Sequence, residues 1–190
     1  MAYITLAELR TYLGAHASDD ALLNDTIAAA TDWIDRYCGH SFELTAATAR
    51  YFTAGAADFV ETDPFVTVTS LRYDIDDDGV YEATVPATAY SVSPSTAPYT
   101  QVWIRNGDGY GLPGERRRVE LTATYGWPTV PGAVKYAAKL QTARLWKRKD
   151  APFGLISGSM GEMERIAGLD PDVKHLLEPF VLSAKRFVLA

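Results

Sequence analysis

The stretch that most constrains the fold of this chain is PGAVKYAAKLQTARLWKRK, residues 131–149. A proline suits the start of a helix, because its missing N–H would have no partner there. Apolar residues then recur at helical spacing over an unusually wide arc, and many of them are alanines. They are Ala133, Val134, Ala137, Ala138, Leu140 and Leu145. The sequence therefore predicts a central helix that other helices can approach closely on more than one side.

Two helices near the N-terminus are predicted to pack on this central helix. The first begins with a capping box of Thr5 and Glu8 and ends at Gly14. The second begins at residues 18–20 with a capping residue and two carboxylates, and it ends at Gly39. Its apolar stripe consists of Leu23, Ile27, Ala30, Ile34 and Cys38. A two-helix hairpin cannot bury both apolar faces alone, so we expect it to need the central helix.

Between these helical parts the pattern changes to strands. Short runs rich in β-branched and aromatic residues are separated by glycines and prolines, among them Pro64, which we expect to mark turns. Residues 119–125 alternate apolar and polar side chains, as a half-exposed strand does. The predicted fold class is therefore α+β, a small helical bundle with an inserted antiparallel β-sheet or barrel.

The predicted domain organisation has four parts. They are an N-terminal helical hairpin at 1–41, a β subdomain at 42–128, central and C-terminal helices at 129–182, and a C-terminal tail at 183–190. Within the third part we expect a turn-rich loop at 151–161 and a strand at 163–166. The last helix starts at Asp170 and Pro171, and Pro179 should end or kink it.

Composition limits the classes of function. The formal net charge is −6, so we do not expect nucleic acid to be wrapped by a basic surface, whereas DNA could pass such a body without sticking. The single Cys38 cannot form an internal disulfide. No run approaches the ~18 apolar residues of a membrane span. The first residues also lack a signal-peptide pattern, so we expect neither membrane insertion nor export.

An acidic run, residues 74–79, resembles the start of a calcium loop, with Asp74, Asp76 and Asp78 as candidate ligands. The twelfth position of an EF-hand would be Val85, which cannot coordinate a cation. The plainer interpretation is a β-hairpin that turns at residues 78–79. We favour the hairpin and keep a non-EF-hand calcium site as the alternative. The chain shows no catalytic triad or cofactor motif, so we expect no enzyme and no other cofactor.

Two basic clusters remain. Arg144, Lys147, Arg148 and Lys149 lie at the end of the central helix, where cations oppose its dipole. Their number leaves an acidic neighbour or DNA backbone as an alternative role. Residues 116–118 are all arginines, and we expect a solvated sheet edge or, less favoured, a subunit contact with the acidic run.

Trp146 projects from the central helix among Lys135, Lys139 and Thr142, on the side that should face solvent. Either the rest of the chain covers it or another subunit does. The apolar end of the chain, residues 180–190, raises the same question.

Several runs in the helical parts occur together in one order. They are TLAELRTYLG at 5–14, DALL at 20–23, AAATDWIDRYCG at 28–39, YGWP at 125–128, VP at 130–131, RLWKRKDAP at 144–152 and DPDV at 170–173. In this order they resemble the head–tail connector (adaptor) proteins of tailed bacteriophages. The resemblance covers the helical parts well and the strand-rich middle weakly.

The resemblance implies a structural virion protein that forms a dodecameric ring below the portal. Such a ring extends the DNA channel, without sequence-specific DNA binding, and joins the capsid to the tail or to the next head-completion protein. It is located in the virion neck after assembly in the host cytoplasm. We predict that the C-terminal end binds the portal and that Arg144, Trp146 and Arg148 lie at the subunit interface. The portal-binding residues are Phe180, Phe187, Val188 and Leu189 as apolar anchors, with Lys185 and Arg186 as polar guides.

The rival hypothesis is a monomeric binding module, in which a calcium-dependent β domain recognises a ligand through the loops at 74–79 or 106–114.

Overall fold

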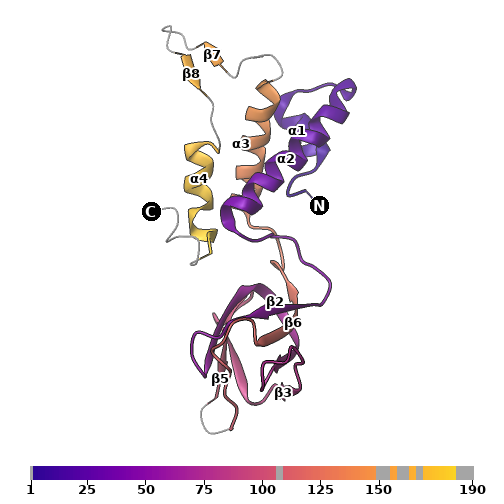
Figure 1. Cartoon of the computed structure of the whole chain (residues 1–190). Coiled ribbons are helices and arrows are strands. Elements are labelled where there is room, and N and C mark those ends of the chain that lie inside the picture. Colours follow the sequence, from indigo (N-terminus) through magenta and orange to yellow (C-terminus); the bar gives the residue numbers. More distant parts are fainter. Residues whose placement is uncertain (1, 106–108, 149–154, 158–162, 166–168, 183–190) are drawn as a thin grey trace. The chain divides into compact units, whose positions relative to one another are not determined.

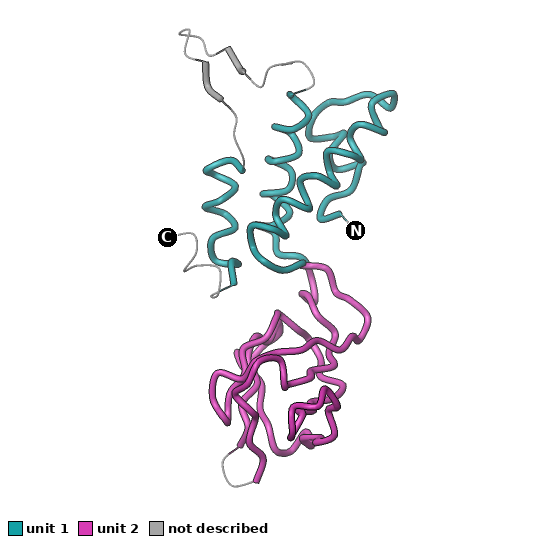
Figure 2. Tube along the Cα trace, viewed as in Figure 1, with its two compact units in different colours: residues 1–41, 130–190 teal, residues 42–129 magenta. Residues whose placement is uncertain are grey.

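The computed structural model describes residues 2–105, 109–148, 155–157, 163–165 and 169–182. The chain divides into two compact units, each described by itself here (Figure 2). The helical unit comprises residues 1–41 and 130–190, and the β unit comprises residues 42–129. The β unit is therefore an insertion between two chain segments that fold together.

The helical unit is organised around α3, Gly132–Lys147, which contacts the three other α-helices (Figure 1). These are α1 at Leu6–Leu13, α2 at Asp20–Cys38 and α4 at Pro171–Leu177, with short 3-10 helices at Ala17–Asp19 (η1) and Glu178–Phe180 (η3). The predicted central role of this helix is confirmed.

Local signals in the sequence account for the helix ends. Thr5 and Glu8 form the predicted capping box of α1, and Gly14 ends the helix with φ of 64°. Gly39 ends α2 with φ of 87°, a left-handed conformation that glycine adopts without steric cost. The buried residues of α2 are the five of the predicted stripe. Pro179 lies in η3, just beyond the end of α4, as predicted.

The β unit is a single antiparallel sheet, which confirms the α+β fold class. Its strands are β1 Thr48–Phe52, β2 Phe59–Tyr73, β3 Ala83–Val85, β4 Tyr90–Ser93, β5 Tyr99–Ile104 and β6 Val119–Tyr125. The strand order is β1-β6-β2-β5-β4, and β3 pairs with β2. Strands β1 and β4 stand at the two ends of this order and do not pair with each other. The strand pairing therefore establishes a sheet, and the predicted alternative of a barrel is not confirmed.

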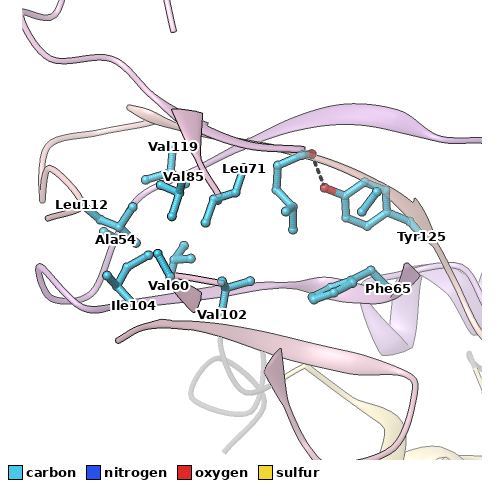
Figure 3. Close-up of a cluster of buried hydrophobic side chains, with 13 residues drawn as sticks. Ala54, Val60, Phe65, Leu71, Val85, Val102, Ile104, Leu112, Val119 and Tyr125 are labelled. Carbon is cyan, nitrogen blue, oxygen red and sulfur yellow. Dashed lines mark hydrogen bonds between the residues drawn. The ribbon is translucent and has the colours of Figure 1, made fainter. Parts of the chain in front are cut away.

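The core of the β unit is built mainly from strand residues, with Ala54, Ala89 and Leu112 from the connections between strands (Figure 3). Along β6, Val119, Leu121, Ala123 and Tyr125 are buried, as the alternation predicted. The Tyr125 hydroxyl donates to the Leu121 carbonyl at 2.7 Å. Burial raises the pKa of this hydroxyl, so it remains a neutral donor. The core residues are Ala54, Val60, Phe65, Leu71, Val85, Ala89, Val102, Ile104, Leu112, Val119, Leu121, Ala123 and Tyr125.

The expectation that Pro64 marks a turn is wrong, because Pro64 lies inside the 15-residue strand β2. Proline cannot donate a hydrogen bond to a neighbouring strand, so it is tolerated in a sheet mainly at edges and bulges. The β2–β5 register shifts between Glu61 and Phe65, and this irregularity accommodates the proline. Its carbonyl still accepts a hydrogen bond from the Gly126 N–H at 2.8 Å.

A second correction concerns the predicted loop at 151–161. Residues Leu155–Ser157 form strand β7, which pairs antiparallel with β8 at Met163–Arg165. The predicted strand at 163–166 is confirmed for its first three residues, and the remaining loop residues lie outside the described part of the chain. Among the described helices, none is both long enough and apolar enough to cross a membrane.

Candidate functional site

The predicted calcium ligands lie together in the connection between β2 and β3. Carboxylate oxygens of Asp74, Asp76, Asp78 and Glu82 all lie within 4.8 Å of one another. Carboxylates are the ligands that hard cations prefer. Glu82 was missed in the sequence, although it stands at the ninth position of a calcium loop that starts at Asp74, a position that often contributes through water. The set could hold a cation chemically.

The same cluster is also explained without an ion. The Asp74 carboxylate accepts backbone N–H bonds from Asp76 at 3.2 Å, Asp77 at 2.7 Å and Gly79 at 2.9 Å. Burial raises the pKa of this carboxyl, but these hydrogen bonds and the nearby Arg118 outweigh burial, so its pKa is lower than usual. Asp74 therefore closes the turn as a charged acceptor.

Arg118 corrects the expectation for the arginine run. The side chain of Arg118 is 10% exposed, and its Nε and Nη2 donate to the Asp74 carbonyl at 3.1 and 2.9 Å. Arg116 and Arg117 are exposed, as expected, but they lie in the turn before β6, which pairs with β1 on one side and β2 on the other, so the expected sheet edge is wrong. The contact between Arg118 and the acidic loop forms within one chain.

At the end of α3, Arg144 forms an ion pair with Asp170, the N-cap residue of α4. This pair provides the acidic neighbour that the sequence analysis considered for the basic cluster. Trp146 and Arg148 are half-buried and Lys147 is exposed, whereas Lys149 lies outside the described residues. The assignment of Arg144, Trp146 and Arg148 to a subunit interface stays a prediction.

The face of α3 that was expected to be wet is partly covered by the chain itself. Thr142 is fully buried, and its hydroxyl donates to the Ala138 carbonyl at 2.7 Å. Gln141 is 2% exposed, and its side-chain oxygen accepts from the Asp170 N–H at 3.4 Å. Helices on several sides of α3 bury these polar residues, which the apolar pattern could not reveal. On α3, Tyr136 is a large hydrophobic side chain that is exposed, at 51%.

The described C-terminal end of the chain is fixed against the end of α2. A ring nitrogen of His40 (Nε2) lies 2.9 Å from the Phe180 carbonyl, and the Leu182 N–H donates to the Cys38 carbonyl at 3.1 Å. Phe180 is half-buried and Val181 is 7% exposed. The other predicted portal-binding residues lie outside the described part of the chain. They are Lys185, Arg186, Phe187, Val188 and Leu189.

Comparison with known families gives one match. Residues 3–65 match the family of phage gp6-like head-tail connector proteins. The match spans α1, α2, β1 and the first part of β2, and it confirms the predicted resemblance over this segment. The family description names a structural connector, in agreement with the prediction that the chain is not an enzyme. No curated protein sequence matches the chain significantly.

Solved structures match nearly the whole chain. One is a chain in the neck of an empty gene transfer agent (GTA) particle, computed with C6 symmetry. The two sequences are 23% identical, the TM-score is 0.58, and the match covers 94% of this chain and 89% of that chain. A chain from the virion of a native GTA particle matches with 23% identity, a TM-score of 0.56 and the same coverage. A chain in the neck of the native particle with C12 symmetry matches with 24% identity, a TM-score of 0.51, and coverage of 92% and 86%. At these identities the likeness establishes a common fold.

Proposed function

We propose that this protein is a structural neck protein of a tailed phage or phage-like particle, where copies of the chain form a ring. The observation that carries the proposal is the combination of two matches. The N-terminal segment resembles a head-tail connector family, and nearly the whole chain shares its fold with chains from particle necks. A shared fold alone does not fix a function, so the proposal depends on both.

In this proposal the ring is dodecameric and sits below the portal. It extends the DNA channel and joins the capsid to the tail or to the next head-completion protein, after assembly in the host cytoplasm. The net charge of −6 supports a channel through which DNA slides, because binding of the DNA backbone depends on lysine and arginine contacts. A heterologous interface repeated around an axis closes into a ring when its rotation is right.

The C-terminal end is the proposed contact with the portal. His40 and the Cys38 carbonyl hold residues 180 and 182 against the end of α2, so the residue that precedes the tail has a defined position. In the tail, Phe187, Val188 and Leu189 would be the apolar anchors and Lys185 and Arg186 the polar guides, with Phe180 at its base.

The test is deletion of residues 183–190, measured as binding of the full-length and shortened proteins to the cognate portal ring. We expect portal binding to be lost while the melting temperature stays unchanged. A control variant keeps the tail length but replaces Phe187, Val188 and Leu189 by serine, and it should lose binding equally. Unchanged portal binding after the deletion would contradict the assignment of the tail. Wild-type protein that stays monomeric both alone and with the portal, by light scattering and negative-stain imaging, would contradict the ring.

The rival function, a calcium-dependent binding module, is supported by the four clustered carboxylates around Asp74. This function predicts a monomer whose melting temperature rises when calcium is added to chelator-treated protein.

A further inference from the structure

Helix α3 presents an apolar stripe on the side opposite its buried residues. Tyr136, Leu140 and Ala143 recur at helical spacing on this side, and Lys147 continues the row. Tyr136 is 51% exposed, and Leu140 and Ala143 are half-buried. We name these four residues the α3 outer stripe. A tyrosine flanked by small apolar side chains is typical of the centre of a protein–protein contact.

Helix α2 presents a second stripe, again opposite its buried residues. Leu22, Asp25, Ala29 and Asp32 recur at helical spacing and are all exposed, with Leu22 at 42%. We name these four residues the α2 outer stripe. Since α2 and α3 pack against each other, their outer stripes lie on different sides of the helix pair. One chain can therefore use both stripes at once, as a ring with head-to-tail contacts requires.

The two helices carry opposite charge. Within its bounds α3 has four basic residues, Lys135, Lys139, Arg144 and Lys147, and no acidic residue. Helix α2 has four aspartates and one arginine, a net charge of −3 (four negative minus one positive). A contact between these helices in different copies would bring opposite charges together, and such complementarity favours one partner and one orientation.

Part of this charge is engaged within the chain, and part is not. On α3, Arg144 pairs with Asp170 and Lys139 lies 3.9 Å from Glu8. On α2, Asp20 pairs with Arg10, Asp32 pairs with Arg36, and Asp35 accepts a hydrogen bond from the Tyr3 hydroxyl. In contrast, Asp25 on α2 and Lys135 and Lys147 on α3 make no ion pair with any residue that the structure describes. Each helix therefore has at least one charged side chain without an ion-pair partner among the described residues, close to its exposed apolar side chain, Leu22 or Tyr136.

We propose that the α3 outer stripe of one copy packs against the α2 outer stripe of the next copy, repeated head to tail around the ring. The inference rests on the proposed function and specifies which surfaces build the ring. Tyr136 lies at the centre of the contact opposite Ala29, and the lysines of α3 lie near Asp25 and Asp32.

The experiment uses two full-length variants, each with one blocked stripe. Tyr136→Glu places a negative charge on the α3 outer stripe, and Ala29→Arg places a bulky cation on the α2 outer stripe. Both positions are exposed and both new residues are good helix formers, so the melting temperatures should stay unchanged. His175→Arg on the exposed side of α4 is the matched control, and it should assemble like the wild type.

Under conditions in which the wild type forms rings, alone or on the portal, we expect each blocked variant to remain monomeric. An equimolar mixture of the two should form 1:1 dimers, because one intact α2 stripe meets one intact α3 stripe. Sedimentation velocity should show this mixed association to be at least about 100-fold tighter than self-association of either variant, or ~2.7 kcal/mol.

Three results would overturn the assignment of the stripes. The first is ring formation by either blocked variant, and the second is a mixture that stays monomeric. The third is a lower melting temperature of the Tyr136→Glu monomer, which would mean that the chain itself covers the stripe. None of these concerns wild-type assembly, so they are distinguishable from failure of the proposed function, in which the wild type itself forms no ring.

Discussion

One interior element of each unit, strand β6 in the β unit and helix α3 in the helical unit, is buried by different side chains. Strand β6 contributes Val119, Leu121 and Tyr125 to a core of large apolar side chains. Helix α3 contributes alanines, Val134 and two buried polar residues. Small side chains remove less apolar surface from water, so each buried position of α3 stabilises the fold less than one of β6. The difference agrees with the proposal that the helical unit gains from neighbouring copies, whereas the β unit is complete in itself.

The largest effect is expected where β6 ends. Gly126 has φ of +113°, and a Cβ atom there would lie 1.9 Å from the Glu43 carbonyl oxygen. Because that neighbour is backbone, Gly126→Ala should destabilise the β unit by at least about 4 kcal/mol. The control is Gly114→Ala, where a Cβ meets nothing within 4 Å and the expected change is within about 0.5 kcal/mol. Urea unfolding monitored by hydrogen exchange of β6 measures both, and equal effects of the two substitutions would contradict the steric argument.

The next prediction compares β6 and α3 directly. Leu121→Ala in β6 should cost about 3 kcal/mol, because the substitution leaves a cavity among large side chains. Val134→Ala in α3 should cost about 2 kcal/mol, since fewer methyl groups are removed. Each loss should appear only in the hydrogen exchange of its own unit.

Assembly should separate these two variants further. If the helical unit gains from neighbouring copies, ring formation should slow hydrogen exchange in the helical unit of Val134→Ala as much as in that of the wild type, because binding to the folded state stabilises both by mass action. Exchange in the β unit of Leu121→Ala should be the same in the ring and in the monomer. Equal slowing of hydrogen exchange in both units on ring formation, or slowing in neither, would remove the distinction between the units.

The elements with one clear periodicity could be predicted from the sequence. The apolar stripe of α2, the alternation of β6 and the capping box at Thr5 depend on residues close together in the sequence, and the structure shows all three. The failures have long-range causes. Pro64 is tolerated by a register shift between β2 and β5, and Thr142 is buried by surrounding helices.

The candidate sites divide in the same way. Asp74, Asp76 and Asp78 were identified from their spacing, whereas the contribution of Arg118 depends on a contact that spans 44 positions in the chain. The pairing of Arg144 with Asp170 likewise depends on tertiary structure. Spacing can nominate residues that are close in sequence, but it cannot show which distant charge compensates them.

A smaller effect concerns pH and the acidic loop of the β unit. The pKa of Asp74 is lower in the folded state than its ordinary value of about 3.9. Its charged form therefore stabilises the β unit fully above that value, and the contribution is lost as pH falls through it toward the folded pKa. We expect Asp74→Asn to be less stable than the wild type at neutral pH, with the difference in urea midpoint narrowing below about pH 4. A difference that stays constant between neutral and acid pH would mean that the charge of Asp74 contributes nothing.

The smallest expected effect is that of calcium, and it decides whether the β unit is complete in itself. Three backbone N–H groups and Arg118 already compensate the charge of Asp74, so we expect calcium added to chelator-treated protein to leave the melting temperature unchanged. The measurement is sensitive enough, because a site exposed to calcium at 100 times its dissociation constant would gain about 2.7 kcal/mol. A rise that Asp76→Asn and Glu82→Gln both remove would establish the metal site. The β unit would then depend on an ion as the helical unit is proposed to depend on neighbouring copies, and the contrast between the units would no longer hold.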